Sequence, residues 1–254
     1  MNDVTSATPY ENLTPDTILA AVESAGRLSD GRLLALNSYE NRVYQVGIED
    51  SAPLIAKFYR PGRWSDAAIL EEHAFSRELT DAEIPVVAPL ADAQGATLLH
   101  HAGYRFALFP RQGGRAPDLE RPDQLEWLGR FIGRIHAVGA AGRFQNRPKI
   151  DIETLGRRPR EFILHSGFLP PELVPRYREV TDLLLAGVTR SFERAGEFRH
   201  IRLHGDCHPG NLLWTDKGPH FVDLDDCATG PAVQDLWMLL AGSRADMQQQ
   251  LGHV

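Results

Sequence analysis

Hydrophobic and polar positions in the first sixty residues change period once. Residues 15–25 follow a helical spacing, with Thr14 in the N-cap position and Pro15 in the first turn, and they predict a helix. From about residue 32 to residue 59, β-branched and aromatic residues alternate or run together between turn signals. This region therefore predicts three β-strands.

The second predicted helix carries an acidic residue where an apolar one is expected. Ser65 is its N-cap, and Ile69, Phe75 and Leu79 follow at helical spacing. Glu72 falls on the same stripe, where a solvated carboxylate would not be expected. The position of Glu72 indicates a buried partner of positive charge.

Beyond this helix the pattern predicts more strand and then mainly helix. Two weakly signalled strands within 86–100 and a clearer strand at 104–110 precede a Gly- and Pro-containing segment at 111–117. Further helices are predicted over about 122–138, within 151–165, and over about 172–194. A short β segment follows, and the last predicted helix opens at Pro231.

These elements predict an α+β fold of two lobes. Residues 1–110 form an N-lobe with a β-sheet and one internal helix, and residues 111–117 form a linker. Residues 118–254 form a mainly helical C-lobe with a small β insertion.

Composition and charge exclude several classes of function. A net charge of −7 argues against a general nucleic-acid-binding protein, and the short apolar stretches predict no membrane-spanning helix. Residues 1–13 have neither a basic start nor an apolar run, so we expect no secretory signal. Two cysteines cannot form a disulfide framework, and a cytoplasmic location is the expectation.

Lysine is rare in this chain, because only Lys57, Lys149 and Lys217 contribute to its 27 basic residues. Lys57 lies within the apolar strand pattern LIAKFY. A strand lysine is more often an exposed residue at a sheet edge. Here the rarity of lysine and the position of Glu72 favour a functional pair, in which the helix carboxylate holds a phosphate-binding lysine.

The most specific motif is a group of acidic and amide residues near the C-terminus. Asp206 is followed after five residues by Asn211, and Asp223 lies twelve residues further on in the apolar run FVDL. Asn and Asp oxygens suit Mg²⁺, which leaves Asp206 free to accept a proton from a hydroxyl. This is the division of roles in kinase phosphoryl transfer. The alternative, a capped turn with solvated carboxylates, fits poorly with the apolar neighbours of Asp223.

Five segments carry a resemblance to a known family. HGDCHPGN and FVDLDD resemble the catalytic loop and metal segment of the aminoglycoside phosphotransferase/choline kinase superfamily. There is a closer resemblance to the bacterial stress response kinase A family, the YihE-like Ser/Thr protein kinases. It is carried by LNSYENRVYQV (36–46), AKFYRPGRW (56–64), ILEEH (69–73), LHGDCHPGNLLW (203–214) and FVDLDDCATGPAVQDLWMLL (221–240). The resemblance runs from about residue 10 to the end and implies a bilobal protein-kinase-like fold.

The resemblance also implies how ATP and Mg²⁺ are bound. Lys57 would contact the α and β phosphates, held by Glu72, with Glu71 as the alternative partner one residue off the apolar face. Ser38, in the polar loop 37–41, is the implied side-chain contact to phosphate. The adenine would lie against the linker strand, near the backbone of Phe109 and Arg111.

Other polar residues near the motif have more local interpretations. Asp235 would tie down the backbone of the catalytic loop, as kinase-like folds require. Asp225 could contact a second metal ion, and Asp226 could cap the following turn.

Cys207, beside the proposed base, is a candidate redox-sensitive thiol. A zinc site built from Cys207, His208, Cys227 and His204 is disfavoured, because the Asp206 loop must stay open to substrate. His136 is expected to be a core histidine and His204 to shape the loop.

We therefore expect an ATP- and Mg²⁺-dependent phosphotransferase in which Asp206 and Asp223 are catalytic and Asn211 and Asp223 hold the metal. The resemblance implies a stress-response Ser/Thr protein kinase capable of autophosphorylation, acting on protein hydroxyls. The alternatives are a small-molecule kinase of the aminoglycoside, choline or homoserine type, a catalytically silent nucleotide-binding regulator, and a metal-dependent hydrolase. Neither nucleic acid nor membrane is an expected partner.

The length of the chain raises a further expectation. Proteins of this family usually continue with several more helices, so we expect C-terminal helices to be missing here. Their loss would expose apolar surface around Trp237 and Leu240. We expect a monomer, with self-association as the alternative if the chain is truncated.

Overall fold

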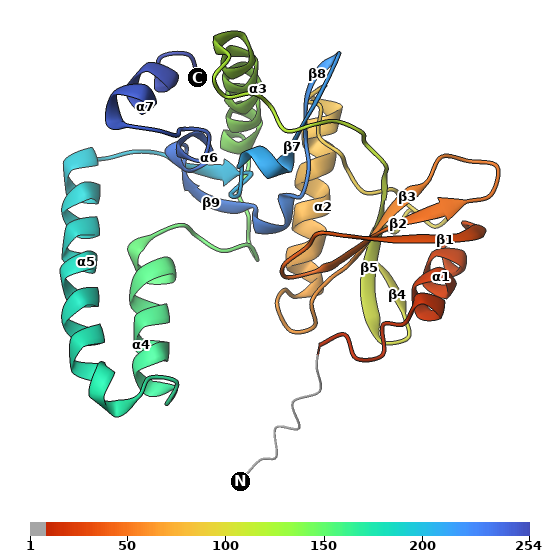
Figure 1. The fold of residues 1–254 in the computed structure, drawn as a ribbon, viewed down its shortest axis with the longest axis horizontal. Helices are drawn as coiled ribbons and strands as arrows, with labels where there is room; N and C mark the ends of the chain where they lie inside the picture. Colours follow the sequence, from red (N-terminus) through yellow and green to blue (C-terminus); the bar gives the residue numbers. More distant parts are fainter. Residues whose placement is uncertain (1–8) are drawn as a thin grey trace.

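A five-stranded antiparallel β-sheet forms the N-lobe (Figure 1). The computed structural model describes residues 9–254 of the chain. The strand order is β1-β2-β3-β5-β4, so β3 lies at the centre of the sheet. The strands are β1 (Ser29–Leu36), β2 (Arg42–Ile48), β3 (Leu54–Phe58), β4 (Leu99–His101) and β5 (Tyr104–Pro110).

Two helices of the N-lobe begin at the N-caps that the sequence predicts. The hydroxyl of Thr14 caps α1 (Pro15–Ser24), and that of Ser65 caps α2 (Asp66–Asp81), each accepting a backbone N–H at 3.2 Å. α1 buries Ile18 against the sheet in one apolar cluster of the N-lobe. Both helices therefore form for the local reasons that their sequences give.

The second helix, α2, packs in both lobes. Ile69, near its start, packs with Tyr59 and Ala107 of the sheet region. Phe75 and Leu79, farther along, lie in the hydrophobic core of the C-lobe together with residues of α3 and β8. Because Glu72 stands between these two sets of contacts, α2 places that residue where the lobes meet.

The C-lobe combines helices with two small antiparallel β pairs. β6 pairs with β9, and β7 pairs with β8. The helices α4 and α5 contact each other and extend to one side of this lobe (Figure 1). The elements are α3 (Pro122–Ala140), α4 (Arg158–His165), α5 (Val174–Ala195), β6 (His200–Leu203), β7 (Leu212–Thr215), β8 (Gly218–Phe221), β9 (Ala228–Pro231), α6 (Val233–Trp237) and α7 (Arg244–Leu251).

The two strands predicted within 86–100 are largely wrong. Only the short β4 forms there, and Val86 makes a single parallel bridge to Phe221 of the C-lobe. Pro85 and Pro89 lack the N–H groups that a continuous ladder needs. The segment instead connects the lobes, with the N–H of Val87 donating to the carbonyl of Phe221 at 2.9 Å.

The predicted last helix also differs from the structure. Pro231 ends strand β9, where it pairs with His200, and α6 begins only at Val233. A separate helix, α7, follows and carries a capping box between Ser243 and Asp246. The helix predicted within 151–165 begins as a π-helical turn, Glu153–Arg157, before α4. Among residues 9–254, no helix has both the length and the apolar character needed to cross a membrane.

Candidate functional site

The Asp206 loop, residues 204–211, connects β6 to β7 and holds Asp206 beside Asn211. The side-chain amide of Asn211 donates to the Asp206 carboxylate at 3.1 Å and to the Asp206 carbonyl at 2.9 Å. Because the amide nitrogen is used in this way, the Oδ1 atom of Asn211 is left to accept or to bind a cation. The two residues that the sequence pattern singled out are thus brought together.

Asp235 holds the backbone of this loop, as the sequence analysis predicted. Its buried carboxylate accepts the N–H of His204 at 3.0 Å and that of Gly205 at 2.8 Å. His136 contacts the same carboxylate at 3.0 Å, so this histidine is satisfied within the core. Charge-assisted hydrogen bonds of this kind fix the start of the loop.

Gly205 allows the loop to lie directly against the Asp223 segment, residues 222–227. Its φ of +87° is left-handed, and a Cβ atom there would lie 2.1 Å from the carbonyl oxygen of Asp226. His204 shapes the same contact, because its Nε2 lies 3.0 Å from the carbonyl oxygen of Val222. The Asp206 loop and the Asp223 segment are therefore in direct backbone contact.

Asp223 does not lie within a strand, which corrects the sequence prediction. β8 ends at Phe221, and Asp223 adopts a left-handed φ of +58° before the 3-10 helix Leu224–Asp226. The left-handed residue interrupts the apolar run, and the Asp223 side chain is 48% exposed. Its carboxylate consequently faces Lys57 and open space instead of the apolar core.

Lys57, on the central strand β3, is the buried cation of the site. Its Nζ lies 3.3 Å from Glu72 Oε1, 2.8 Å from Asp223 Oδ1 and 3.2 Å from Asp225 Oδ1. Burial alone would lower the pKa of Lys57, but the three carboxylates raise it well above its usual range. Burial raises the pKa of Glu72 to about 7, against the opposing effect of Lys57. Glu72 is therefore the α2 carboxylate that pairs with Lys57.

Glu71 has a different set of partners. Its carboxylate accepts the consecutive backbone N–H groups of Gln145, Asn146 and Arg147 at 2.7, 2.8 and 3.0 Å. These residues follow α3, so Glu71 fixes α2 to the C-lobe. Residue 71 is thus a structural anchor, and its neighbour residue 72 contacts the lysine.

Two arginines of the site were missed by the sequence analysis. Arg63 forms ion pairs with Asp225 and Asp226, and Arg147 donates to the backbone carbonyls of Asp225 and Cys227. Arginine is so common in this chain that composition could not mark these two. The motif AKFYRPGRW contains Arg63, but its contacts depend on the tertiary structure.

The predicted nucleotide-contacting residues lie around the sheet edge. Ser38 is exposed in the loop between β1 and β2. Phe109 lies on β5 and packs against the cluster of Tyr59 and Ile69. Arg111 follows β5 and donates to the side chain of Gln45 at 2.7 Å. Their roles in binding ATP stay predictions.

The hypothesis of a redox-sensitive Cys207 is not supported by its surroundings. Cys207 and Cys227 are both fully buried in the C-lobe core. Burial raises the pKa of the Cys207 thiol well above its ordinary value, with smaller contributions from Asp235 and Asp206. A buried neutral thiol is a poor nucleophile, so this cysteine fills space beside the loop.

Oxygen donors for Mg²⁺ are present, although no protein-only metal cluster is. Within residues 9–254, no group of three or more His, Cys, Asp or Glu side chains is arranged to hold a metal ion. Mg²⁺ in phosphoryl-transfer enzymes takes only one or two protein carboxylates and completes its shell with phosphate and water. The free Oδ1 of Asn211 and the half-exposed carboxylate of Asp223 fit this requirement.

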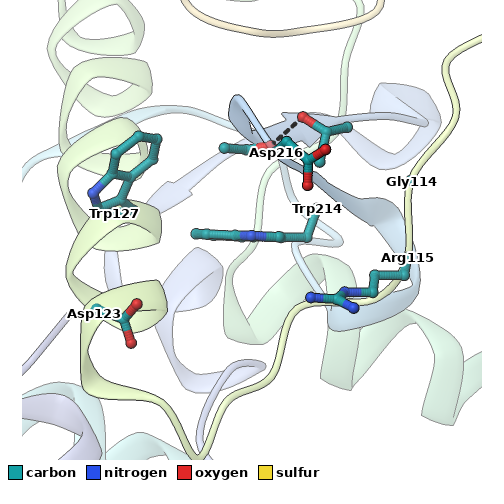
Figure 2. Close-up of a pocket in the computed structure, with 8 residues that line it drawn as sticks. Gly114, Arg115, Asp123, Trp127, Trp214 and Asp216 are labelled. Carbon is teal, nitrogen blue, oxygen red and sulfur yellow. Dashed lines mark hydrogen bonds between the residues drawn. The ribbon is translucent and has the colours of Figure 1, made fainter.

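A separate pocket of about 480 Å³ lies between the linker, α3 and the β7–β8 hairpin. Figure 2 shows Trp127 and Trp214 on its walls, with Arg115 on another side. The ring centroids of the two tryptophans are 6.0 Å apart. This pocket shares no residue with the Lys57 cluster or the Asp206 loop.

Sequence comparison identifies the class to which this fold and site belong. The chain matches the phosphotransferase enzyme family over residues 32–253 and belongs to that family. An antiparallel N-lobe sheet, a helical C-lobe and a lysine–carboxylate cluster between them agree with this assignment. The chain is therefore a kinase-like phosphotransferase, and ATP-dependent phosphoryl transfer is its activity.

Two bacterial kinases are similar along nearly the whole chain. Stress response kinase A of Escherichia coli (strain K12) is 47% identical over 246 residues, which are 97% of this chain and 74% of that protein. Serine/threonine protein kinase RdoA of Salmonella typhimurium (strain LT2) is 46% identical over 251 residues, 99% of this chain and 75% of that protein.

Solved structures of small-molecule kinases share the fold. Amicoumacin kinase hAmiN, in complex with AMP-PNP, Ca²⁺ and Ami, superposes with a TM-score of 0.69 at 19% identity, over 92% of this chain and 75% of that one. Spectinomycin phosphotransferase APH(9)-Ia, in complex with ADP and spectinomycin, gives 0.62 at 14% identity, over 94% and 78% of the two chains. At these identities the likeness concerns the fold.

Proposed function

We propose that this chain is an ATP- and Mg²⁺-dependent serine/threonine protein kinase that also phosphorylates itself. The supporting observation is that the buried Lys57 contacts Glu72 and Asp223, next to an Asp206 loop in which Asn211 orients the carboxylate. The names of the relatives that are 46–47% identical support a protein hydroxyl as acceptor.

Each residue has a defined task in this proposal. Asp206 accepts a hydrogen bond from the acceptor hydroxyl and takes its proton as the oxygen attacks the γ-phosphorus of ATP. The bond between that phosphorus and the β–γ bridging oxygen breaks, and ADP leaves. Lys57, held by Glu72, neutralises charge on the α and β phosphates. Asn211 and Asp223 would hold Mg²⁺, which supplies further neutralisation of phosphate charge. Positioning and electrostatic stabilisation provide most of the rate enhancement.

The experiment is transfer of label from γ-³²P-ATP with Mg²⁺, by wild type and by Asp206→Asn. We offer a Ser/Thr-containing basic protein in one set of reactions, and choline or an aminoglycoside in another. The proposal predicts labelled protein, including the kinase itself, and a loss of at least about 10²–10⁴-fold in Asp206→Asn, as removal of a general base implies. Label on the small molecules alone would replace the protein-kinase proposal with a small-molecule kinase.

A further inference from the structure

Asp225 is a buried carboxylate that the proposed phosphotransfer does not use. Only 2% of the residue is exposed. One carboxylate oxygen lies 3.2 Å from Lys57 Nζ, and the other forms an ion pair with Arg63. Lys57 and Arg63 are thus its two cationic side-chain partners. A charge buried this deeply is stable only while its partners are in place.

Arg63 connects the N-lobe to the Asp223 segment. It lies between β3 and α2, and its guanidinium forms ion pairs with both Asp225 and Asp226, the second at 2.5 Å. The same guanidinium stands 5.1 Å above the ring of Trp64. The planar fork of arginine lets two different nitrogens of one guanidinium each contact a separate carboxylate.

A second arginine fixes the backbone of the same segment. Arg147 donates from Nε to the carbonyl of Cys227 at 2.9 Å, and another of its nitrogens donates to the carbonyl of Asp225. Its guanidinium lies 4.2 Å from the centre of the Trp64 ring. Arg147 therefore holds the main chain, and Arg63 is left to hold the side chains.

The charges around Lys57 show what Arg63 contributes. Glu72, Asp223 and Asp225 bring three negative charges to one ammonium group. When Lys57 contacts a nucleotide phosphate, Asp225 must keep a cation of its own, and Arg63 is the one in contact with it. Without Arg63, Asp225 would hold Lys57 back from the nucleotide.

We propose that Arg63 is a positioning residue for nucleotide binding, which neutralises Asp225 and thereby leaves Lys57 available to the phosphates of ATP. This inference deepens the proposed function and rests on it. It also gives Asp225 a role other than the second metal contact considered from the sequence. Arg63 acts through Lys57 and Asp225 and does not itself touch the reacting atoms.

The test is direct binding of Mg-AMP-PNP by titration calorimetry to Arg63→Met, Asp225→Asn and the double variant. Arg130→Met is the matched control, because Arg130 is an exposed arginine of α3 that pairs with Glu126 on the same helix. We expect Arg63→Met to weaken binding by about tenfold or more, since it leaves a buried charge uncompensated. Asp225→Asn has a smaller effect, and the double variant regains most of the affinity lost in Arg63→Met.

If Arg63 had only a structural role, the double variant would not regain nucleotide affinity while both variants remain folded. Circular dichroism and thermal melting of each variant confirm that binding is measured on folded protein, and Arg63→Lys restores part of the affinity if folding of Arg63→Met is impaired. In steady state, the KM for ATP rises more than kcat falls. Binding by Arg63→Met equal to that of Arg130→Met would overturn the inference, as would a double variant no better than Arg63→Met. Failure of the wild type to bind Mg-AMP-PNP would instead contradict the proposed function.

Discussion

Three carboxylates surround Lys57, and their arrangement determines what nucleotide binding must change at the level of single residues. Asp223 is the nearest of the three at 2.8 Å and the most exposed, at 48%. Glu72 and Asp225 are buried in the protein interior. A phosphate group that approaches Lys57 therefore competes with Asp223, so one anionic partner is exchanged for another.

Behind Lys57 lies a buried hydrogen-bonded chain that makes stability depend on pH. Tyr59 Oη lies 2.7 Å from His73 Nε2, and His73 Nδ1 lies 2.8 Å from Thr97 Oγ1. Burial, aided by Lys57, lowers the pKa of His73 from 6.5 to about 3. Between these values the unfolded chain binds a proton at His73 and the folded protein does not. The contribution of His73 to stability is therefore lost as pH falls below 6.5.

We predict that His73→Gln removes the His73 contribution from the pH dependence of stability. From pH 6.5 to pH 5 the His73 contribution to the free energy of unfolding falls by about 2 kcal/mol in wild type and is absent in the variant. Glu72, whose pKa is raised from 4.5 to about 7, acts with opposite sign, because it binds a proton in the folded state. Wild type and His73→Gln both contain Glu72. The difference between their free energies of unfolding in urea, measured at each pH, therefore gives the contribution of His73 alone.

Exposed His165→Gln serves as the control for this comparison. Its free energy of unfolding should follow wild type at every pH. Parallel pH profiles for His73→Gln and wild type would show that His73 is not held neutral in the folded protein.

At the scale of elements, Glu71 joins α2 to the backbone of the segment that follows α3. The carboxylate accepts three consecutive backbone N–H groups, at residues 145–147. We predict that Glu71→Gln costs about 1.5–3 kcal/mol of stability, as expected for lost hydrogen bonds to a charged group. Hydrogen exchange at amides 145–147 should accelerate.

Glu78→Gln is the matched control on the same helix. Glu78 pairs with the side chain of Arg202 at 2.7 Å, without contacting residues 145–147. Exchange at those three amides should stay as in wild type for Glu78→Gln. If Glu71→Gln also leaves their exchange unchanged, α2 is held by its apolar face alone.

The same helix shows how far sequence reasoning reaches. The Ser65 cap and the buried position of Glu72 depend on local spacing, and both were predictable. The choice of Glu72 over Glu71 followed from helical periodicity. The partners of Glu71 were not predictable, because they are backbone groups about 75 residues away. Arg63 was missed for the same reason, since its partners Asp225 and Asp226 are separated from it by 162 and 163 positions along the chain.

Asp223 and Pro231 show where local pattern misleads. An apolar run predicted a strand through Asp223, but the chain turns left-handed at that residue to present its carboxylate. Pro231 suited a helix start by propensity, yet pairing with β6 used it at the end of a strand. Tertiary contacts outweighed the local signal in both cases.

At the scale of the whole molecule, apolar side chains remain on the outside of the C-lobe. Leu183 and Leu184 on α5 and Phe162 on α4 are 68%, 61% and 62% exposed, and Trp237 is 53% exposed. From the sequence, exposure was expected around Trp237 and Leu240; Trp237 is exposed, whereas Leu240 is half-buried. The structure extends it to the pair of helices α4 and α5, which extends to one side of the lobe (Figure 1).

We predict that this chain self-associates as its concentration rises, because exposed apolar area of this kind is covered when two copies meet. Sedimentation velocity should show the mean mass increasing with concentration in wild type and less so in Leu184→Lys. Lys217→Glu, which changes an exposed loop residue elsewhere, should behave as wild type. A single monomeric species at every concentration would contradict the prediction.

The central claim is that this chain transfers the γ-phosphoryl group of ATP through a site centred on Asp206. The most direct test is the intact mass of the protein after incubation with Mg-ATP and a Ser/Thr-containing protein acceptor, for wild type beside Asp206→Asn. We predict additions of about 80 Da, the mass of one phosphoryl group, on the kinase and on the acceptor in wild type only. Equal phosphorylation by both proteins would remove Asp206 from the mechanism. No addition by a wild-type chain that binds Mg-ATP would contradict the account of a protein kinase.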